Sequence, residues 1–291
     1  MIELAPQLRP FALAWAAFAG AAIGSFLNVV IARMPAGQSV VHPRSRCPRC
    51  QKPIAWYDNL PVLSWVLLRA RCRSCKAPIS VRYPIVELLG GAAALVAVAR
   101  HGFSFAALAE FAFVALLIAL SAIDLDTWLL PHALTWPLIG LGLVAAALGV
   151  GAAESFKSAA YGAGVGFASF GAVAVFGERI LKKEAMGWGD VWLLAGLGAF
   201  LGLKAILPIV LLASIQGAAV GILLIVIGRA QPGRAAPAPD AAATPSDSDD
   251  DDWVPPKNAV PFGPFLALGA LEWLWGAGLM SRVVPFLDVF R

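Results

Sequence analysis

Long apolar stretches separated by short polar turns are the main pattern along this chain. A helix of about 20 apolar residues is long enough to cross the hydrocarbon core of a bilayer. Helices also satisfy their own backbone hydrogen bonds in lipid. We therefore predict an all-α polytopic membrane protein with about eight transmembrane helices. The eight stretches are Phe11–Ile31, Tyr83–Ala99, Phe103–Ile123, Pro131–Val150, Ala159–Ile180, Val191–Leu203, Ala205–Gly228 and Phe262–Phe286.

Composition supports this prediction. Of the 291 residues, 59% are hydrophobic and only 14% are charged, whereas soluble domains carry about 25% charged residues. The first stretch has a longer apolar core than a signal peptide and no strongly basic segment before it, so we expect a retained helix. The predicted organisation is a first transmembrane helix (1–33), a loop module (34–82) and a transmembrane core (83–291).

The charge distribution predicts how the helices are oriented. The loop 34–82 carries nine basic residues against one acid, Asp58, a net charge of +8. Basic loops stay on the cytoplasmic side of a membrane. With eight spans, the N-terminus then lies outside, and the turns at 124–130 and 182–190 lie in the cytoplasm. The chain's overall charge of +4 thus reflects topology, and we expect the lipid bilayer as a partner and no nucleic acid.

A second polar segment, 229–258, is rich in Ala, Pro, Ser and Asp and includes the acidic run Asp249–Asp252. Such a composition buries too little apolar surface to offset the entropy of ordering, so a disordered cytoplasmic loop is predicted. The loop could capture a basic substrate segment, but composition favours a solvated linker. No internal repeat is evident along the chain.

All four cysteines lie in the loop 34–82, as two CxxC pairs 21 residues apart. Four thiolates at such spacing are typical of a tetrahedral zinc site, although the spacer slightly exceeds the usual 15–20 residues. Two disulfides or free thiols are the alternatives, and a cytoplasmic location disfavours disulfides. Zinc would fold a module that is too small to fold by burial alone, and a full shell would make it structural. The predicted ligands are Cys47, Cys50, Cys72 and Cys75.

Few carboxylates lie within or beside the apolar stretches, and such groups are functional candidates because their burial is costly. They are Glu87, Glu110, Asp124, Asp126, Asp190 and Glu272. Asp124 directly follows the third stretch and Asp190 directly precedes the sixth, so topology brings both to the same face at similar depth. Two neighbouring carboxylates can run acid–base hydrolysis, one activating water and the other donating a proton.

A purely structural role for this pair is the competing hypothesis. Asp190 would then be only a helix N-cap, and Asp124 only an interfacial acid. The two glycines just before Asp190, Gly187 and Gly189, favour the functional hypothesis. We expect them to adopt positive φ and let the backbone pass close to a substrate strand.

Six stretches together resemble the type IV prepilin peptidases, which are prepilin leader peptidase/N-methyltransferases of the GxGD aspartyl protease class. They appear in the family's order and extend over nearly the whole chain. They read GSFLNVVIARMP, SRCPRC, NLPVLSWVLLRARCRSCKAPISVRYPIVELLGG, AIDLDTWLLP, KEAMGWGDVWLLAGLGAFLG and PFGPFLALGA.

The resemblance implies a multi-pass enzyme of the bacterial inner membrane with its active site facing the cytoplasm. Its substrates would be type IV prepilins and type II secretion pseudopilins, cleaved after a basic leader. Asp124 and Asp190 match the family's two catalytic aspartates, and Asp126 matches an acid outside that pair. The cysteines match the family's tetracysteine motif, which favours N-methylation of the new N-terminus with S-adenosylmethionine as methyl donor. No pattern locates the methyl-donor site, and Glu87 is a weak candidate either for methylation or for packing.

Two other function classes remain compatible with the sequence. A proton-coupled transporter could use paired acids and glycine-rich helix breaks, but it does not account for the tetracysteine module. A zinc-containing membrane scaffold would need neither aspartate for activity.

Overall fold

The computed structural model describes residues 6–181, 186–226 and 260–283, and in this part of the chain all regular elements are helical. The predicted disordered loop at 229–258 lies outside the described residues. The helices are α1 (Arg9–Arg33), α2 (Leu63–Leu67), α3 (Arg82–His101), α4 (Phe105–Thr127), α5 (His132–Ala147), α6 (Phe156–Phe176), α7 (Trp188–Leu201), α8 (Ile206–Val226) and α9 (Gly263–Val283). A π-helical segment, Gly177–Leu181, continues α6, and short 3₁₀ turns occupy Pro6–Leu8, Trp56–Asn59 and Leu203–Ala205.

Each of the eight predicted stretches coincides with one of these helices, and the short α2 lies in the loop module. Five helical segments are long and apolar enough to cross a membrane: Arg9–Arg33, Arg82–His101, Phe105–Thr127, Phe156–Ile180 and Leu203–Val226. The apolar helices α5 and α7 have only 16 and 14 residues, about 24 and 21 Å of helix. The helical class is therefore confirmed, whereas eight spans stay a prediction.

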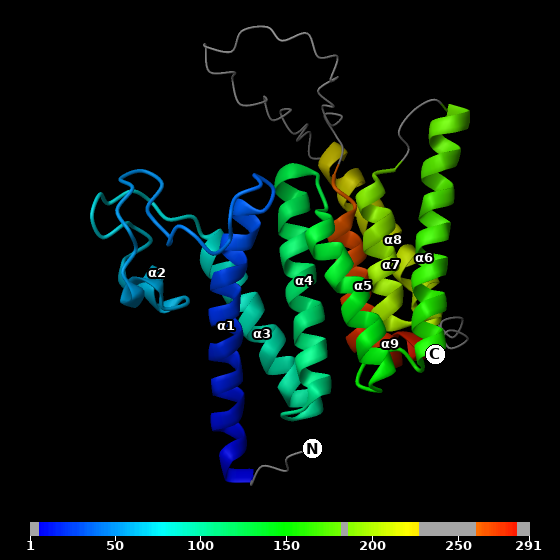
Figure 1. The fold of residues 1–291 in the computed structure, drawn as a ribbon, viewed down its shortest axis with the longest axis horizontal. Helices are drawn as coiled ribbons and strands as arrows, with labels where there is room; N and C mark the ends of the chain where they lie inside the picture. The colour runs from blue at the N-terminus through cyan, green and yellow to red at the C-terminus, as the bar shows by residue number, and fades with distance from the viewer. Residues whose placement is uncertain (1–5, 182–185, 227–259, 284–291) are drawn as a thin grey trace, which may run out of the picture.

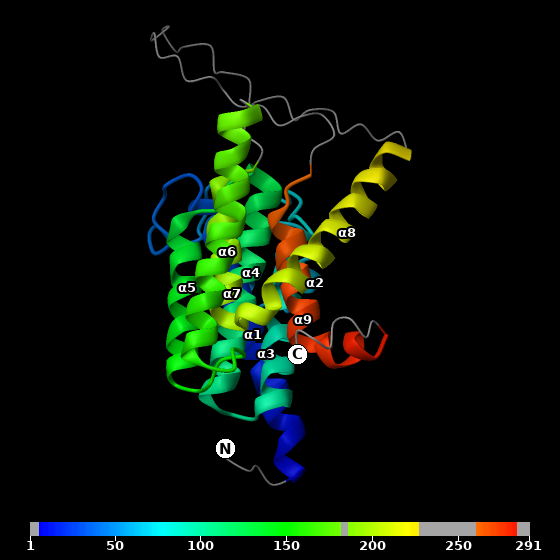
Figure 2. The ribbon, with the colours of Figure 1, turned by 90° about the vertical axis from the view of Figure 1, so that its right-hand side faces the viewer.

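The long helices run alternately up and down (Figure 1). Helices α1 and α3 form one side of the molecule, with the loop module containing α2 beyond them, and α5 to α9 form the other side. Helix α4 lies between the two groups and contacts α1, α3, α5 and α9. In the second view α8 leans away from the other helices at its upper end (Figure 2).

Small residues allow the α1–α3 pair to approach closely. A Cβ atom built on Gly20 would lie 2.4 Å from the Gly90 carbonyl oxygen, and one on Gly24 would lie 2.8 Å from the Glu87 Cα. The two α1 glycines have the G-x-x-x-G spacing of packed membrane helices, where backbone proximity replaces the hydrophobic driving force that is weak in lipid. The close packing of α1 against α3 therefore fixes the position of the first turns of α3, which follow the loop module.

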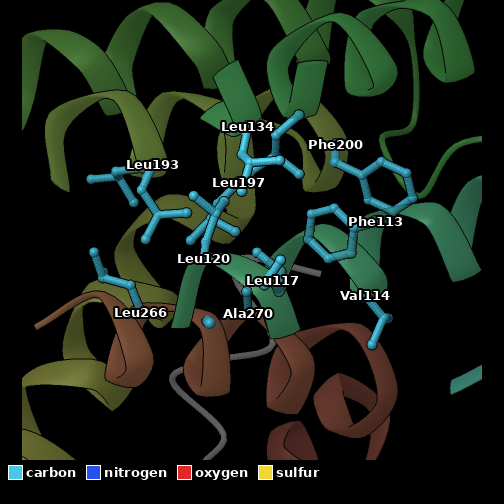
Figure 3. Packing of buried hydrophobic residues seen from close by; sticks show 14 of the residues in the cluster. Phe113, Val114, Leu117, Leu120, Leu134, Leu193, Leu197, Phe200, Leu266 and Ala270 are labelled. Carbon is cyan, nitrogen blue, oxygen red and sulfur yellow. The ribbon is translucent and has the colours of Figure 1, made fainter. Parts of the chain in front are cut away.

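The centre of the second group is α7, whose residues from Leu193 to Leu201 are all buried. A helix that is apolar on every side is expected to be enclosed by others, and α7 contacts α5, α6 and α9. Its Phe200 ring stacks on Phe113 of α4 with centroids 4.1 Å apart. Figure 3 shows side chains from α4, α5, α7 and α9 interlocking around Leu117, Leu120 and Leu197. This packing fixes α4 and α7 relative to each other, and with them the residues at their ends.

Candidate active site and tetracysteine module

Asp124 lies in the last turn of α4 and is held by the start of α9. Only 5% of its surface is exposed. Its Oδ2 atom accepts a hydrogen bond of 3.0 Å from the backbone N–H of Gly263, the first residue of α9. Helix N-termini leave such N–H groups free and favour anions. The carboxylate is thus buried and oriented by a backbone donor.

Asp190 is the third residue of α7. Helix α7 begins at Trp188, with Gly187 as its N-cap and no side-chain capping hydrogen bond, so Asp190 is not the N-cap that the competing structural hypothesis assumes. Its Oδ1 atom is buried and has no hydrogen-bond partner among the described residues. Such an unpaired buried oxygen is costly in a structural role and suits a group that binds water or substrate.

The backbone conformation of the two glycines before Asp190 differs from the prediction of positive φ. Neither Gly187, with φ of −69°, nor the helical Gly189 has positive φ, so that expectation is wrong. Gly189 is instead required by packing, because a Cβ atom there would lie 2.8 Å from the Leu130 Cβ. Gly187 has nothing within 4 Å of a built Cβ among the described residues.

Leu130 brings the two aspartates into one site. Its side chain packs against Gly189, which precedes Asp190, and lies 3.5 Å from a Cβ built on Gly263. Gly263 is in turn the hydrogen-bond donor to Asp124. The structure thus brings the two predicted residues to one place, Asp124 anchored by Gly263 and Asp190 with an Oδ1 atom that has no partner among the described residues.

The other candidate acids are held in structural contacts. Asp126 pairs with Arg82 at the start of α3. Glu87 is buried and accepts a hydrogen bond of 2.7 Å from the backbone N–H of Val62 in the loop module, which supports its packing role. Glu272 accepts a hydrogen bond from Gln216 of α8. Glu110 contacts three side chains at the opposite end of the bundle: Arg100, His101 and Trp275.

The tetracysteine loop is built from two copies of one small motif. Residues 46–54 read RCPRCQKPI and residues 71–79 read RCRSCKAPI. In each copy the residue after the second cysteine has φ of 59° and donates its N–H to the carbonyl of the first cysteine. Each copy also closes with a β-bridge, Arg46 to Pro53 and Arg71 to Pro78. The expectation of no internal repeat is therefore wrong, and the pattern R-C-x-x-C-x-x-P-I was the signal.

The two copies bring the four cysteines into one cluster. Their Sγ atoms all lie within 4.8 Å of one another, and none of the four forms a disulfide. Cys47 Sγ and Cys75 Sγ are 3.7 Å apart, close to the edge of about 3.8 Å expected for a tetrahedron with Zn–S bonds of about 2.3 Å. The backbone N–H groups of Cys50 and Arg49 lower the pKa of the Cys47 thiol to about 6. The pKa of the Cys75 thiol is instead raised to about 11, because the backbone hydrogen bond of Ala77, which lowers it, is outweighed by burial and the three neighbouring thiols, so the metal-free cluster does not hold four thiolates at once. By their spacing, the four cysteines fit a tetrahedral metal ion.

Sequence reasoning missed three residues at the aspartate site. Gly263 was visible only as part of the PFGP stretch, and Leu130 only as an apolar residue in a turn. Arg82 was counted among the basic loop residues, yet its Nη2 donates a 2.9 Å hydrogen bond to the Ala122 carbonyl next to the site. Each role depends on a contact between distant segments.

Comparison with known proteins identifies the family. Residues 18–101 match the bacterial peptidase A24 N-terminal domain, and residues 111–222 match the type IV leader peptidase family. A protein of Myxococcus xanthus named prepilin leader peptidase/N-methyltransferase is 44% identical over 308 residues, covering 91% of this chain and 90% of that protein. The chain belongs to the type IV leader peptidase family.

Other relatives of this leader peptidase family carry the same name. One from Burkholderia pseudomallei is 36% identical, with 94% of this chain and 86% of that protein covered. One from Stutzerimonas stutzeri is 35% identical, with 92% of each covered. No solved structure matches the chain. Asp124 and Asp190 both fall within the leader peptidase match, and the four cysteines fall within the N-terminal domain match.

Proposed function

We propose that this protein cleaves the basic leader peptide from type IV prepilins and type II secretion pseudopilins at the cytoplasmic face of the bacterial inner membrane, using Asp124 and Asp190. It then methylates the new N-terminal amine with S-adenosylmethionine. The observation that carries the proposal is the meeting, around Leu130 and Gly263, of the buried Asp124 carboxylate of α4 and the half-buried Asp190 carboxylate of α7, whose Oδ1 atom is buried, at one end of an apolar bundle. The names of the relatives support the substrate class and both activities.

The proposed cleavage needs one aspartate as a carboxylate and the other as a carboxylic acid. The carboxylate takes a proton from water, whose oxygen attacks the scissile carbonyl carbon, while the acid donates its proton to the carbonyl oxygen. Collapse of the tetrahedral intermediate breaks the C–N bond, and the leaving amine takes up a proton. Like charges in a buried site favour one shared proton. The bond from Gly263 keeps Asp124 in place throughout the cycle.

The tetracysteine cluster is proposed to hold a structural zinc ion through Cys47, Cys50, Cys72 and Cys75. The ion would join the two copies of the motif, which otherwise meet through few buried apolar residues: among the described residues of the module these are Cys47, Pro61 and Ala77. Four thiolates complete the shell and leave no position for substrate. Zinc would therefore stabilise the fold of the module and take no part in the reaction. No residues are assigned to binding of the methyl donor.

Orientation is part of the proposal. The end of the bundle that carries both aspartates also carries the loop module (Figure 1), and that module has the chain's basic excess, which favours the cytoplasmic side. A prepilin's basic leader would remain in the cytoplasm with its apolar helix in the membrane, so the bond between them lies at the depth of these helix ends.

One experiment tests both activities. The purified protein in detergent is incubated with a prepilin peptide and S-adenosylmethionine, and the products are read by mass spectrometry. We expect loss of the leader followed by gain of one methyl group on the new N-terminus. An intact peptide would reject the proposal. The proton-coupled transporter is not favoured by the relatives' names, and it predicts an intact peptide together with proton flux in liposomes.

A further inference from the structure

Arg82 lies at the junction between the loop module and the aspartate site. It is the last residue of the loop module as predicted from the sequence and the first residue of α3. Its Nη1 atom pairs with the Asp126 carboxylate, and its Nη2 atom donates a 2.9 Å hydrogen bond to the Ala122 carbonyl. Ala122 and Asp126 each lie two residues from Asp124, one before it and one after it. Arg82 therefore holds the last turn of α4 on both sides of Asp124.

This contact contributes more to geometry than to stability. The side chains of Arg82 and Asp126 are 36% and 37% exposed, and ion pairs so exposed to solvent stabilise a protein little. The guanidinium is, however, a planar group with fixed donor directions. Two contacts with two points of one helical turn restrict both the tilt and the rotation of that turn, which the single bond from Gly263 cannot do alone.

Helix α3 is itself fixed at this end. Glu87, five residues after Arg82, accepts the N–H of Val62 from the module, and the glycine contacts with α1 lie directly beyond it. Arg82 thus extends toward the last turn of α4 from a helix that is itself held by the loop module and by α1. That turn lacks a continuing helix, because Trp128 reverses the chain with φ of 59°.

We propose that Arg82 is a positioning residue for peptide cleavage, which holds the last turn of α4 so that Asp124 meets Asp190 in the productive arrangement. This inference rests on the proposed function, since it assigns the purpose of the contact to the aspartate pair. A displacement of about 1 Å in a reacting group can cost about 100-fold in rate. Loss of Arg82 should therefore lower kcat for cleavage while leaving prepilin binding unchanged.

The chain contains a matched control for this residue. Arg100 lies on the same helix and also joins α3 to α4, through an ion pair with Glu110 at 3.3 Å. It also donates to a backbone carbonyl, that of Leu274, at 3.3 Å. The two arginines have similar side-chain exposure, 36% and 37%, but Arg100 lies at the end of the bundle away from the aspartates.

The test compares Arg82→Met, Arg82→Lys and Arg100→Met with the wild-type protein, by steady-state cleavage of a prepilin peptide and by thermal unfolding. We expect Arg82→Met to lower kcat about 10-fold with KM within about twofold. Arg82→Lys should recover part of the loss, because it keeps the charge opposite Asp126. Arg100→Met should keep the wild-type kcat whatever its effect on unfolding.

Several outcomes would overturn the inference. These are a wild-type kcat for Arg82→Met, an equal loss of kcat in Arg100→Met, or a change confined to KM, which would make Arg82 a substrate contact. If Arg82→Met does not fold, a folded Arg82→Lys with wild-type kcat rejects the inference, and one with reduced kcat and unchanged KM supports it. A wild-type protein that leaves prepilin intact would instead reject the proposed function itself.

Discussion

A methyl group added at Gly263 should disturb the aspartate site far more than its size suggests. A Cβ atom at this position would lie 2.5 Å from Oδ2 of Asp124, whereas an ordinary contact begins at 3.4 Å. The carboxylate or the start of α9 must therefore move by about 0.9 Å, the difference between those two distances. Alanine keeps the backbone N–H, so the expected loss comes from displacement and not from a missing donor.

Displacement on this scale should lower kcat about 10- to 100-fold. The assay is single-turnover cleavage of a prepilin peptide by Gly263→Ala, with Gly164→Ala in α6 as the control. Gly164 is also helical, and among the described residues nothing lies within 4 Å of its built Cβ. The control should match the wild-type rate, and its stability should rise if anything, since alanine favours helix over glycine by about 1 kcal/mol. A Gly263→Ala rate within about twofold of wild type would refute the assigned role of this contact.

Two further predictions concern the loop module. Freshly purified protein should contain about one zinc per chain, and Cys47→Ser or Cys72→Ser should release it and reduce methylation at least as much as cleavage. Metal analysis without zinc, or normal methylation after replacement of all four cysteines, would contradict this. Glu87→Ala should leave the half-buried Val62 N–H without its acceptor. We expect a loss of about 1 kcal/mol, at the low end of the range for an unpaired donor, and faster proteolysis within the module. Glu87→Gln keeps a carbonyl acceptor and should resist proteolysis as the wild-type protein does. If Glu87→Ala is equally resistant, the hydrogen bond between Val62 and Glu87 does not hold the module to α3.

The helical class was predictable because apolar length is read directly from sequence. Each apolar stretch became a helix, but length did not decide which helices cross the membrane. Helix α7 has 14 residues and is enclosed by its neighbours, so its apolar character reflects burial within protein as much as contact with lipid. Pattern alone cannot separate these two causes.

The aspartates and cysteines were predictable for different reasons. A carboxylate beside an apolar helix is rare and stands out in the sequence, and four cysteines in one loop have few other uses. Gly263 and Arg82 were not predictable, because their roles arise from contacts across 139 and 40 residues of chain. The role expected for Gly189 was wrong because the sequence did not show that Leu130 packs against it.

The central claim is that Asp124 and Asp190 together cleave the leader peptide. The most direct test is the mass of a prepilin peptide after incubation with Asp124→Asn, Asp190→Asn or Asp126→Asn, each shown by thermal unfolding to be folded. Asp126 is the matched control, since it lies two residues from Asp124 on the same helix and pairs with Arg82. We expect no leader loss with the first two variants and most of the wild-type activity with Asp126→Asn, whose amide oxygen still accepts from Arg82. Substantial cleavage by Asp124→Asn or Asp190→Asn would contradict the claim. A loss in Asp126→Asn no larger than that in Arg82→Met would reflect the positioning contact, and only a complete loss would show that the wrong aspartate of α4 had been assigned.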